Sequence, residues 1–233
     1  KSFDRLPELA RRLLSVGAVA GKSFDLSDVE EVGQLDGDLD EAVARLVAEG
    51  ILREETGARG DRYAFTNSLV KDVAYAALPR RPRRALHRAF GELLEGRHGK
   101  ALRRVTADLF RHFAAADEPD RAGRYGLSAA KQALEAGGNE DAIQAAGVAA
   151  HFLESEVGQA EARLLIAWAR RNLGATEEAI AEGAWAAEAF ERASDPRVAD
   201  ACLVAAEAAW DARTPDRTKA WAERGPEAGG HPI

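Results

Sequence analysis

The chain of 233 residues is poor in sulfur: it has one cysteine, Cys202, and no methionine. A single cysteine cannot form a disulfide within the chain. Its neighbours in the stretch DACLVAAEAAW predict a buried helical face, so we interpret it as an inert core thiol. Because the chain begins at Lys1 and has no methionine, we expect either a segment of a longer polypeptide or a chain whose methionines were replaced or lost.

Long apolar runs are also missing. No run approaches the ~20 residues that a membrane-spanning helix needs, and the charged residues between Lys1 and Arg12 exclude the apolar core of a secretion signal. Apolar residues nevertheless make up 46% of the chain, which is enough for a sizeable core. These features predict a globular, cytoplasmic protein without a membrane partner.

Signatures of catalysis and of metal binding are absent as well. The histidines stand at positions 87, 98, 112, 151 and 231, which gives no metal-ligand spacing with each other or with the cysteine. We interpret each as an interfacial or surface residue. No Gly-x-Ser-x-Gly nucleophile motif and no Asp-rich metal loop is present. The sequence therefore predicts no catalytic residue, no metal and no enzyme activity for this segment.

Positive charge is scarce in the second half. The formal charge of −7 divides into 19 Lys/Arg against 17 Asp/Glu over residues 1–104, and 13 against 22 over residues 105–233. The two parts are thus expected to face different partners, or the same partner in different ways.

What the first part does contain is a change of hydrophobic period. Apolar residues at helical spacing predict a helix over about 4–17, a second that opens at Ser27 and a third over about 38–50. Residues 51–55 and 62–65 then read as two short strands around a Gly-rich turn. Three helices and one hairpin in this order predict a small winged-helix domain, to which we assign residues 1–78.

Two further helices follow the predicted hairpin. The first begins with Asn67 as N-cap, ends at Pro79 and is expected to bury Leu69, Val70, Val73, Ala74 and Ala77. The second runs from about Arg84 to Gly96 behind the stretch RRPRR. We define residues 79–104 as a basic helical connector, whose prominent cations are Arg80, Arg81, Arg83, Arg84 and Arg88.

The stretch YAFTNSLVKDVAY, followed by RRPRRALHRAFGELLE, resembles the join between the winged-helix domain and the helical repeats of bacterial STAND-type signalling ATPases. In that family the pattern reads F-x-F-x-H-x-L-h-R-D/E-x-A-Y … R-x-x-L-H-x-x-h-A-x-x-L-E. The matching positions are Phe65, Leu69, Lys71, Asp72, Ala74, Tyr75, Arg83, Leu86, His87 and Glu95. Asn67 stands where the family pattern has histidine. By this resemblance, Asn67 is the one residue of this chain that is a candidate for nucleotide sensing.

The resemblance implies a regulatory role. In such proteins an AAA-like ATPase module, often linked to a nucleotidyl-cyclase, kinase or LuxR-type DNA-binding domain, precedes this region. ATP or ADP would then be bound by an upstream domain, with no cofactor in this segment. The partner would be a protein, a peptide or another domain of the same polypeptide.

The second part of the chain carries an internal repeat. Ala130, Gly137, Ala142 and Ala149 recur 37 residues later as another Ala, Gly, Ala and Ala. Small residues at fixed positions let paired helices approach closely, as in tetratricopeptide (TPR) repeats. We therefore expect three or four helix pairs over residues 105–225, stacked as a TPR-like right-handed α-solenoid, and a disordered tail over residues 226–233. The predicted fold class is mainly α.

A solenoid of this kind has a concave surface formed by the first helix of each pair. The residues that the TPR-like register places there are Arg124, Lys131, Trp168, Arg171 and Asn172. One interpretation is a partner-binding groove. The other is that Trp168 belongs to the core and that the charges are only solvated.

Gly21-Lys22-Ser23 resembles the end of a phosphate-binding P-loop. That loop needs a glycine, then four residues, then Gly-Lys-Ser/Thr, and a buried strand before it. Here the glycine position is taken by Val16, and an amphipathic helix precedes the loop. We therefore do not interpret the stretch as the ATP site of an enzyme. The resemblance to STAND ATPases implies instead a joint between the first two helices of the winged-helix domain, in which Gly21 lets the chain turn and Phe24 fills the core.

A DNA-binding transcriptional regulator is the alternative function, because nine Lys/Arg stand between Arg80 and Arg104 beside a predicted winged helix. The expected recognition helix, DLDEAVARLVAEG, is however acidic and would be repelled by phosphates. The preferred hypothesis is a non-catalytic regulatory and protein-interaction segment that does not bind nucleic acid.

Overall fold

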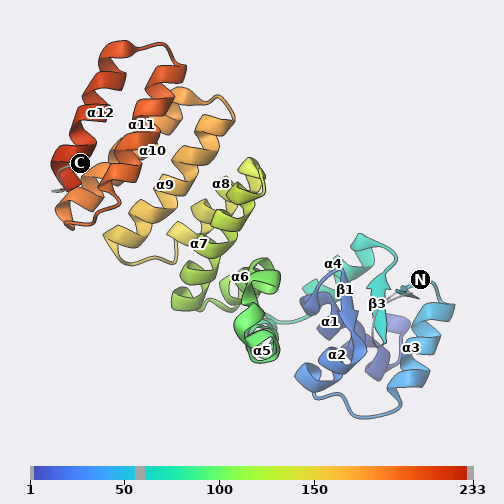
Figure 1. Cartoon of the computed structure of the whole chain (residues 1–233). Coiled ribbons are helices and arrows are strands. Elements are labelled where there is room, and N and C mark those ends of the chain that lie inside the picture. The colour runs from blue at the N-terminus through green and yellow to red at the C-terminus, as the bar shows by residue number, and fades with distance from the viewer. Residues whose placement is uncertain (1–2, 56–60, 230–233) are drawn as a thin grey trace. The chain divides into compact units, whose positions relative to one another are not determined.

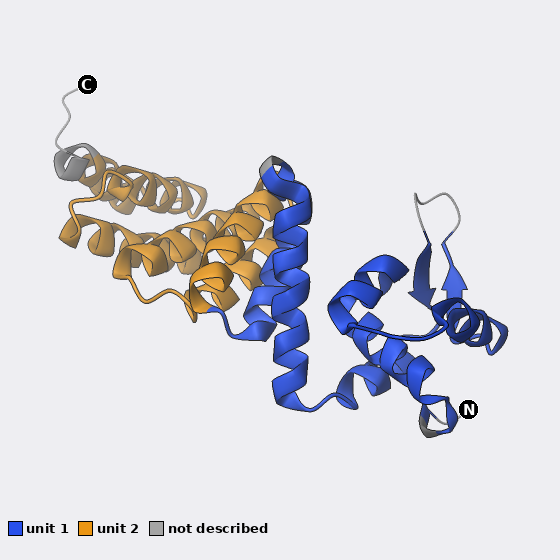
Figure 2. Cartoon of the chain, turned by 90° about the horizontal axis from the view of Figure 1, so that it is seen from below, with its two compact units in different colours: residues 1–118 blue, residues 119–233 orange. Residues whose placement is uncertain are grey.

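The computed structural model describes residues 3–55 and 61–229 and confirms the mainly α fold class (Figure 1). Within these residues it contains twelve α-helices and a small three-stranded antiparallel sheet. The chain divides into two compact units, residues 1–118 and residues 119–233 (Figure 2). None of the helices in the described ranges is both long and apolar enough to cross a bilayer.

The first unit opens with a 3₁₀ turn, η1 (Phe3–Arg5), and three helices, α1 (Glu8–Ala20), α2 (Leu26–Gly33) and α3 (Leu39–Ala48). All three lie where the apolar period predicted helices. Asp38 caps α3, since its carboxylate accepts a hydrogen bond from the backbone N–H of Glu41 at 2.9 Å.

The sheet of the first unit has the order β1-β3-β2, with β1 at Ser23–Asp25, β2 at Leu52–Glu54 and β3 at Arg62–Phe65. The predicted hairpin is confirmed: β2 pairs with β3 so that Leu52 lies opposite Phe65. The turn predicted between them falls on residues 56–61, of which only Asp61 is described. The third strand, β1, was not predicted; it pairs with the other edge of β3.

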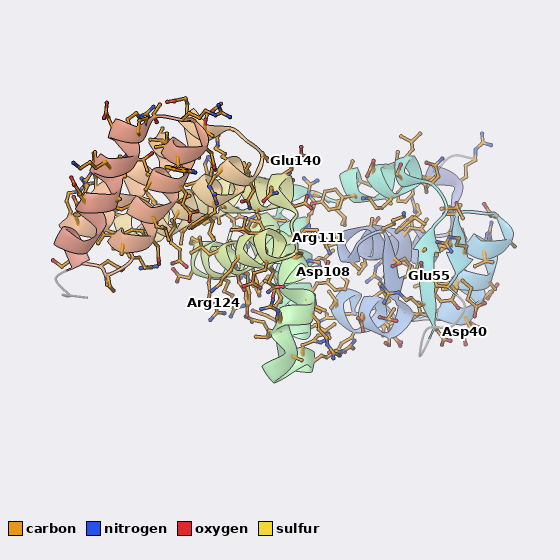
Figure 3. All side chains as sticks on the ribbon, turned by 45° about the horizontal axis from the view of Figure 1, so that its top comes forward. Asp40, Glu55, Asp108, Arg111, Arg124 and Glu140 are labelled. Carbon is orange, nitrogen blue, oxygen red and sulfur yellow. The ribbon has the colours of Figure 1, made fainter. Side chains whose placement is uncertain are left out.

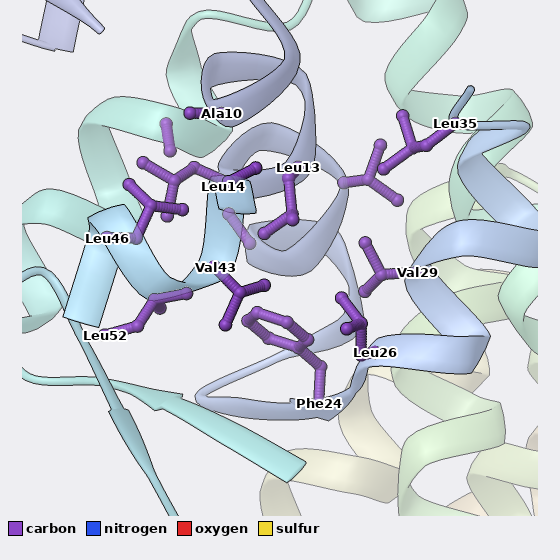
Figure 4. Close-up of a cluster of buried hydrophobic side chains, with 14 of the residues drawn as sticks. Ala10, Leu13, Leu14, Phe24, Leu26, Val29, Leu35, Val43, Leu46 and Leu52 are labelled. Carbon is purple, nitrogen blue, oxygen red and sulfur yellow. The ribbon is translucent and has the colours of Figure 1, made fainter. Parts of the chain in front are cut away.

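Side chains from all these elements form the core of the first unit. Figure 4 shows the ring of Phe24 between the side chains of Val43 and Leu26, with Leu13 and Leu14 of α1 above it. Burial of each such leucine contributes about 1.5–3 kcal/mol. At Gly17 an added Cβ would come within 2.7 Å of the Phe24 ring, so α1 and β1 meet closely only because this residue is glycine.

Helices α4 (Ser68–Ala76), α5 (Arg80–His98) and α6 (Thr106–Ala116), with a 3₁₀ segment η2 (Gly99–Val105), complete the first unit. Asn67 caps α4 as predicted, with its side-chain oxygen 2.8 Å from the N–H of Leu69. The predicted burial of α4 was partly wrong. Ala74 is buried and Val70 half-buried, but Leu69 is 67% and Val73 45% exposed, and Ala77 is exposed too.

The second unit has six helices within residues 119–229. They are α7 (Pro119–Glu135), α8 (Asn139–Ala150), α9 (Glu156–Asn172), α10 (Thr176–Arg192), α11 (Val198–Asp211) and α12 (Pro215–Gly229). Consecutive helices pack side by side, in the order in which they follow one another (Figure 1). Helix α12 continues to Gly229, so the predicted tail begins within a helix, and residues 230–233 lie outside the described part of the chain.

The 37-residue period recurs in the structure. Helix α9 begins 37 residues after α7, and α10 begins 37 residues after α8. All the alanines of the repeat are fully buried: Ala130, Ala142, Ala149, Ala167, Ala179 and Ala186. Gly137 and Gly174 both have positive φ, +81° and +79°, directly after the first helix of their pair. Small residues therefore recur because helix contacts and turns recur.

Candidate functional site

The Gly21-Lys22-Ser23 stretch serves the sheet of the first unit. Helix α1 precedes it, the carbonyl of Lys22 accepts a hydrogen bond from the N–H of Phe65, and the hydroxyl of Ser23 lies 3.0 Å from a guanidinium nitrogen of Arg62. Gly21 has φ +151°, as a turn at this point requires. This stretch therefore lacks the strand that precedes a phosphate-binding loop.

The predicted groove residues are spread over the second unit, and several are engaged within the chain. Arg171 forms ion pairs with Glu207 at 2.8 Å and Asp211 at 3.0 Å on α11, and lies 5.9 Å from the ring centre of Trp168. Trp168 is half-buried against the core of α9, α10 and α11.

The other groove residues have separate environments. Asn172 donates to the side-chain oxygen of Asn139. Arg124 is exposed, stacks on the ring of Tyr125 and projects from α7 (Figure 3). Lys131 is exposed on the same helix. Of this set the structure brings together only Arg171 and Trp168.

The arginines of the basic connector lie on α5, which begins at Arg80. Arg84 forms an ion pair with Asp117 and Arg88 one with Glu118. Arg83 lies over the ring of Tyr75, with its guanidinium carbon 4.8 Å from the ring centre. Arg80 and Arg81 are exposed at the first turn of α5. Much of the positive charge on this helix is thus balanced within the first unit.

A buried chain of polar groups joins α4, α5 and α6. The hydroxyl of Tyr75 is 2.9 Å from Nε2 of His87, and Nδ1 of His87 is 3.0 Å from Nδ1 of His112. Nε2 of His112 is 2.9 Å from a guanidinium nitrogen of Arg111. His87 and His112 are 3% and 1% exposed. We call these four side chains the histidine network.

The direction of each hydrogen bond in the histidine network follows from Arg111, because a guanidinium only donates. His112 must accept at Nε2, so its proton is on Nδ1 and is donated to Nδ1 of His87. His87 then carries its proton on Nε2 and donates it to the oxygen of Tyr75. Both rings are neutral in this arrangement, and every ring nitrogen has a partner.

Burial and neighbouring charge keep these rings neutral. Burial, and then the positive charges of Arg111 and Arg83, lower the pKa of His87 to about 4. Burial, followed by Arg111 and His87, lowers the pKa of His112 to about 2. A buried imidazolium would lose hydration and face a guanidinium, so both effects act in the same direction.

Arg111 extends the histidine network to α1. Its guanidinium donates to the carbonyl oxygens of Val19 at 3.1 Å and Ala20 at 2.6 Å, at the end of that helix. Asp108, one turn earlier on α6, lies 3.5 Å from the same guanidinium, and the two residues are neighbours in Figure 3. A cation at a helix C-terminus also complements the helix dipole. The network therefore fastens α4, α5 and α6 to α1.

Sequence spacing alone missed this arrangement, because His87 and His112 are 25 positions apart on different helices. The available signal was the apolar neighbourhood of each: Leu86 and Phe90 flank the first, and Leu109 and Phe113 flank the second. Packing supports the contact. Phe90 stacks on His112 with ring centres 5.4 Å apart, and a Cβ added at Gly91 would come within 2.7 Å of Phe113.

Two other chemical features can be placed. Cys202 is buried as predicted, and burial raises the pKa of its thiol. In the part of the chain that the structure describes, no three His, Cys, Asp or Glu side chains gather as a metal site would require.

Comparisons of the chain with protein-family models, with curated proteins and with solved structures found no match.

Proposed function

We propose that this chain is a non-catalytic regulatory and protein-interaction segment of a cytoplasmic, multidomain signalling ATPase of the STAND type. In this proposal the first unit contains a winged-helix domain that couples to an upstream nucleotide-binding module. The second unit is a TPR-like array that senses a protein partner or effector.

The observation that carries the proposal concerns three residues of the STAND-like pattern. Tyr75, Arg83 and His87 come from two helices, and they meet in space: the Tyr75 hydroxyl lies against His87, and the Arg83 guanidinium lies over the Tyr75 ring. Residues that a family shares for a structural reason are expected to touch. These contacts support the proposal that the sequence pattern marks one structural joint, at the end of the proposed winged-helix domain of residues 1–78.

The repeats of the second unit support the interaction role. Ion pairs connect residues 36 to 40 positions apart, such as Arg192 with Glu156 and Arg217 with Glu177, so successive helix pairs contact each other in a regular way. Arrays of this architecture have extended surfaces for partners. Regulation would require a partner to bind one state of the whole protein more tightly than another.

The test is made on the full polypeptide that contains this chain. Nucleotide hydrolysis is measured for that polypeptide with and without residues 119–233. We expect removal of the second unit to change the basal rate, because the proposed sensor is lost. An unchanged rate, or the absence of any nucleotide-binding module from the polypeptide, would contradict the proposal.

The two rival functions are tested on the chain itself. DNA binding is disfavoured because α3 carries Asp40 and Glu41, while its Arg45 is paired with Glu49 at 3.2 Å. A gel-shift assay of the chain with duplex DNA at physiological salt is expected to show no tight complex.

The other rival is an enzyme that uses Lys22 to bind ATP. Such an enzyme would bind ATP and lose this affinity in Lys22→Ala, whereas we expect no ATP binding by the unmodified chain or by the variant.

A further inference from the structure

A cleft of about 760 Å³ lies in the first unit between α1, the end of α2, the two residues that follow α4, and α5. Its volume is in the range of small-molecule sites. Part of its wall is apolar: Val16, Val32, Leu78, Pro82, Ala85 and Leu86. Arg11 and Arg12 of α1 line the same space, so we call it the Arg11–Arg12 cleft.

The two arginines of this cleft are poorly satisfied. Among the described residues, no carboxylate lies within ion-pair distance of either guanidinium. The Nε of Arg11 is shielded from solvent and has no hydrogen-bond partner. Arg12 is exposed to solvent, and within the chain it reaches only the carbonyl oxygens of Gly33 at 3.5 Å and Gln34 at 3.4 Å.

The Nε of Arg170 is likewise buried without a hydrogen-bond partner, but many of the other described arginines are paired with carboxylates. Arg62, Arg197 and Arg224 each form close ion pairs with one or two carboxylates. A guanidinium nitrogen that is buried without a partner, as the Nε of Arg11 is, costs free energy, and guanidiniums bind oxyanions strongly through paired N–H groups. Glu8 also lines the cleft, which leaves two cations against one carboxylate.

We propose that the Arg11–Arg12 cleft binds an amphipathic small molecule with an oxyanion head, a carboxylate or a phosphate, on an apolar body. The head would lie at the guanidiniums of Arg11 and Arg12. The apolar body would lie along the wall formed by Val16, Leu78 and Leu86. This inference rests on the cleft alone and does not depend on the proposed regulatory role.

The test is isothermal titration calorimetry of the whole chain with decanoate, decyl phosphate, decanol and acetate. The three ten-carbon compounds are used below the concentrations at which they aggregate. We expect both anions to bind, decanol to bind at least about tenfold more weakly, and acetate not to bind. The ratio of decanoate to decyl phosphate affinity identifies the preferred head group.

Three variants locate the site. Arg11→Gln and Arg12→Gln should each weaken decanoate about tenfold while leaving decanol unchanged. Ala85→Trp, at an exposed position on α5, should fill the cleft and weaken all ligands. Arg45→Gln, outside the cleft on α3, is the matched control and should have no effect. Failure of decanoate to bind, equal binding of decanol, or insensitivity of decanoate to all three cleft variants would overturn the proposal.

Discussion

The Nδ1 atoms of His87 and His112 lie 3.0 Å apart inside the first unit, and one proton must be shared between them. If His112 were protonated, its Nε2–H would point at the guanidinium of Arg111, so that two donors would face each other. If His87 were protonated, two N–H groups would meet at the Nδ1 contact. The network is thus complete only when both rings are neutral.

The first prediction concerns stability in mild acid. Both histidines have folded-state pKa values below the ordinary 6.5, at about 4 and about 2. As pH falls from about 6.5 to about 4, the unfolded chain takes up protons that the folded unit does not, so the free energy of unfolding decreases. The slope is about 1.4 kcal/mol per pH unit for each histidine. Hydrogen exchange of the backbone amides of α5 and α6, followed from pH 7 to pH 4.5, measures this decrease in the free energy of unfolding.

Variants separate this effect from other titrations. His112→Leu should reduce the pH slope of α5 and α6, although it also lowers stability at pH 7 because His87 loses a partner. His151→Gln is the matched control, since His151 is exposed on the second unit. A slope that is the same in His112→Leu and in the unmodified chain would show that the histidine network does not titrate as described.

A second prediction concerns the hydroxyl of Tyr75. Tyr75→Phe removes the acceptor of the Nε2–H of His87 and leaves a buried donor without a partner. The expected loss is about 1–3 kcal/mol of unfolding free energy. Tyr63→Phe on β3, where the side chain is half-buried, should change stability little. Denaturant unfolding followed by far-UV circular dichroism compares the two; equal effects would argue against the Tyr75–His87 bond.

The helices and the repeat could be predicted because their signals are local or periodic. Phe24 was expected in the core and is buried. Buried alanines at a 37-residue spacing follow from helix contacts that recur at the same spacing. By contrast, β1 has only three residues, too few to show a period, and forms through pairing with β3, whose residues lie 37 to 41 positions away.

The wrong burial predicted for α4 and the histidine contact that the sequence did not predict have one physical origin. Leu69 and Val73 lie on the apolar stripe of α4, and a stripe predicts only that a face can be buried, not that a neighbour covers it. His87 and His112 meet because α5 and α6 pack against each other, which no spacing along the chain encodes. Contacts between helices determine both which face of α4 is buried and which histidines meet.

A third prediction concerns the first turn of α5. Arg80 and Arg81 are exposed there, and no acidic residue stands in that turn, although a helix N-terminus favours negative charge. Arg80→Glu and Arg81→Glu should each raise stability by about 0.3–1 kcal/mol at low salt. Arg97→Glu, at the other end of the helix, should lower it, because Arg97 pairs with Asp28 and Glu31. Thermal unfolding in low and high salt would reveal both effects, and a loss of stability in Arg80→Glu would contradict the dipole argument.

The last prediction compares one substitution at two glycines of the second unit. At Gly174, φ is +79° and nothing lies within 4 Å of an added Cβ, so Gly174→Ala has only a backbone cost, about 1 kcal/mol. Gly147 lies within α8, also with open space around it. Gly147→Ala should therefore stabilise by about 0.5–1 kcal/mol, because alanine is the better helix former.

Tryptophan fluorescence can report both glycine variants without interference from the first unit, because all four tryptophans of the chain lie between positions 168 and 221. In urea titrations the midpoint should fall for Gly174→Ala and rise for Gly147→Ala, with similar slopes. Shifts in the same direction would mean that the turn after α9 does not require positive φ. The recurrence of glycine at positions 137 and 174 would then need another explanation than the shared turn.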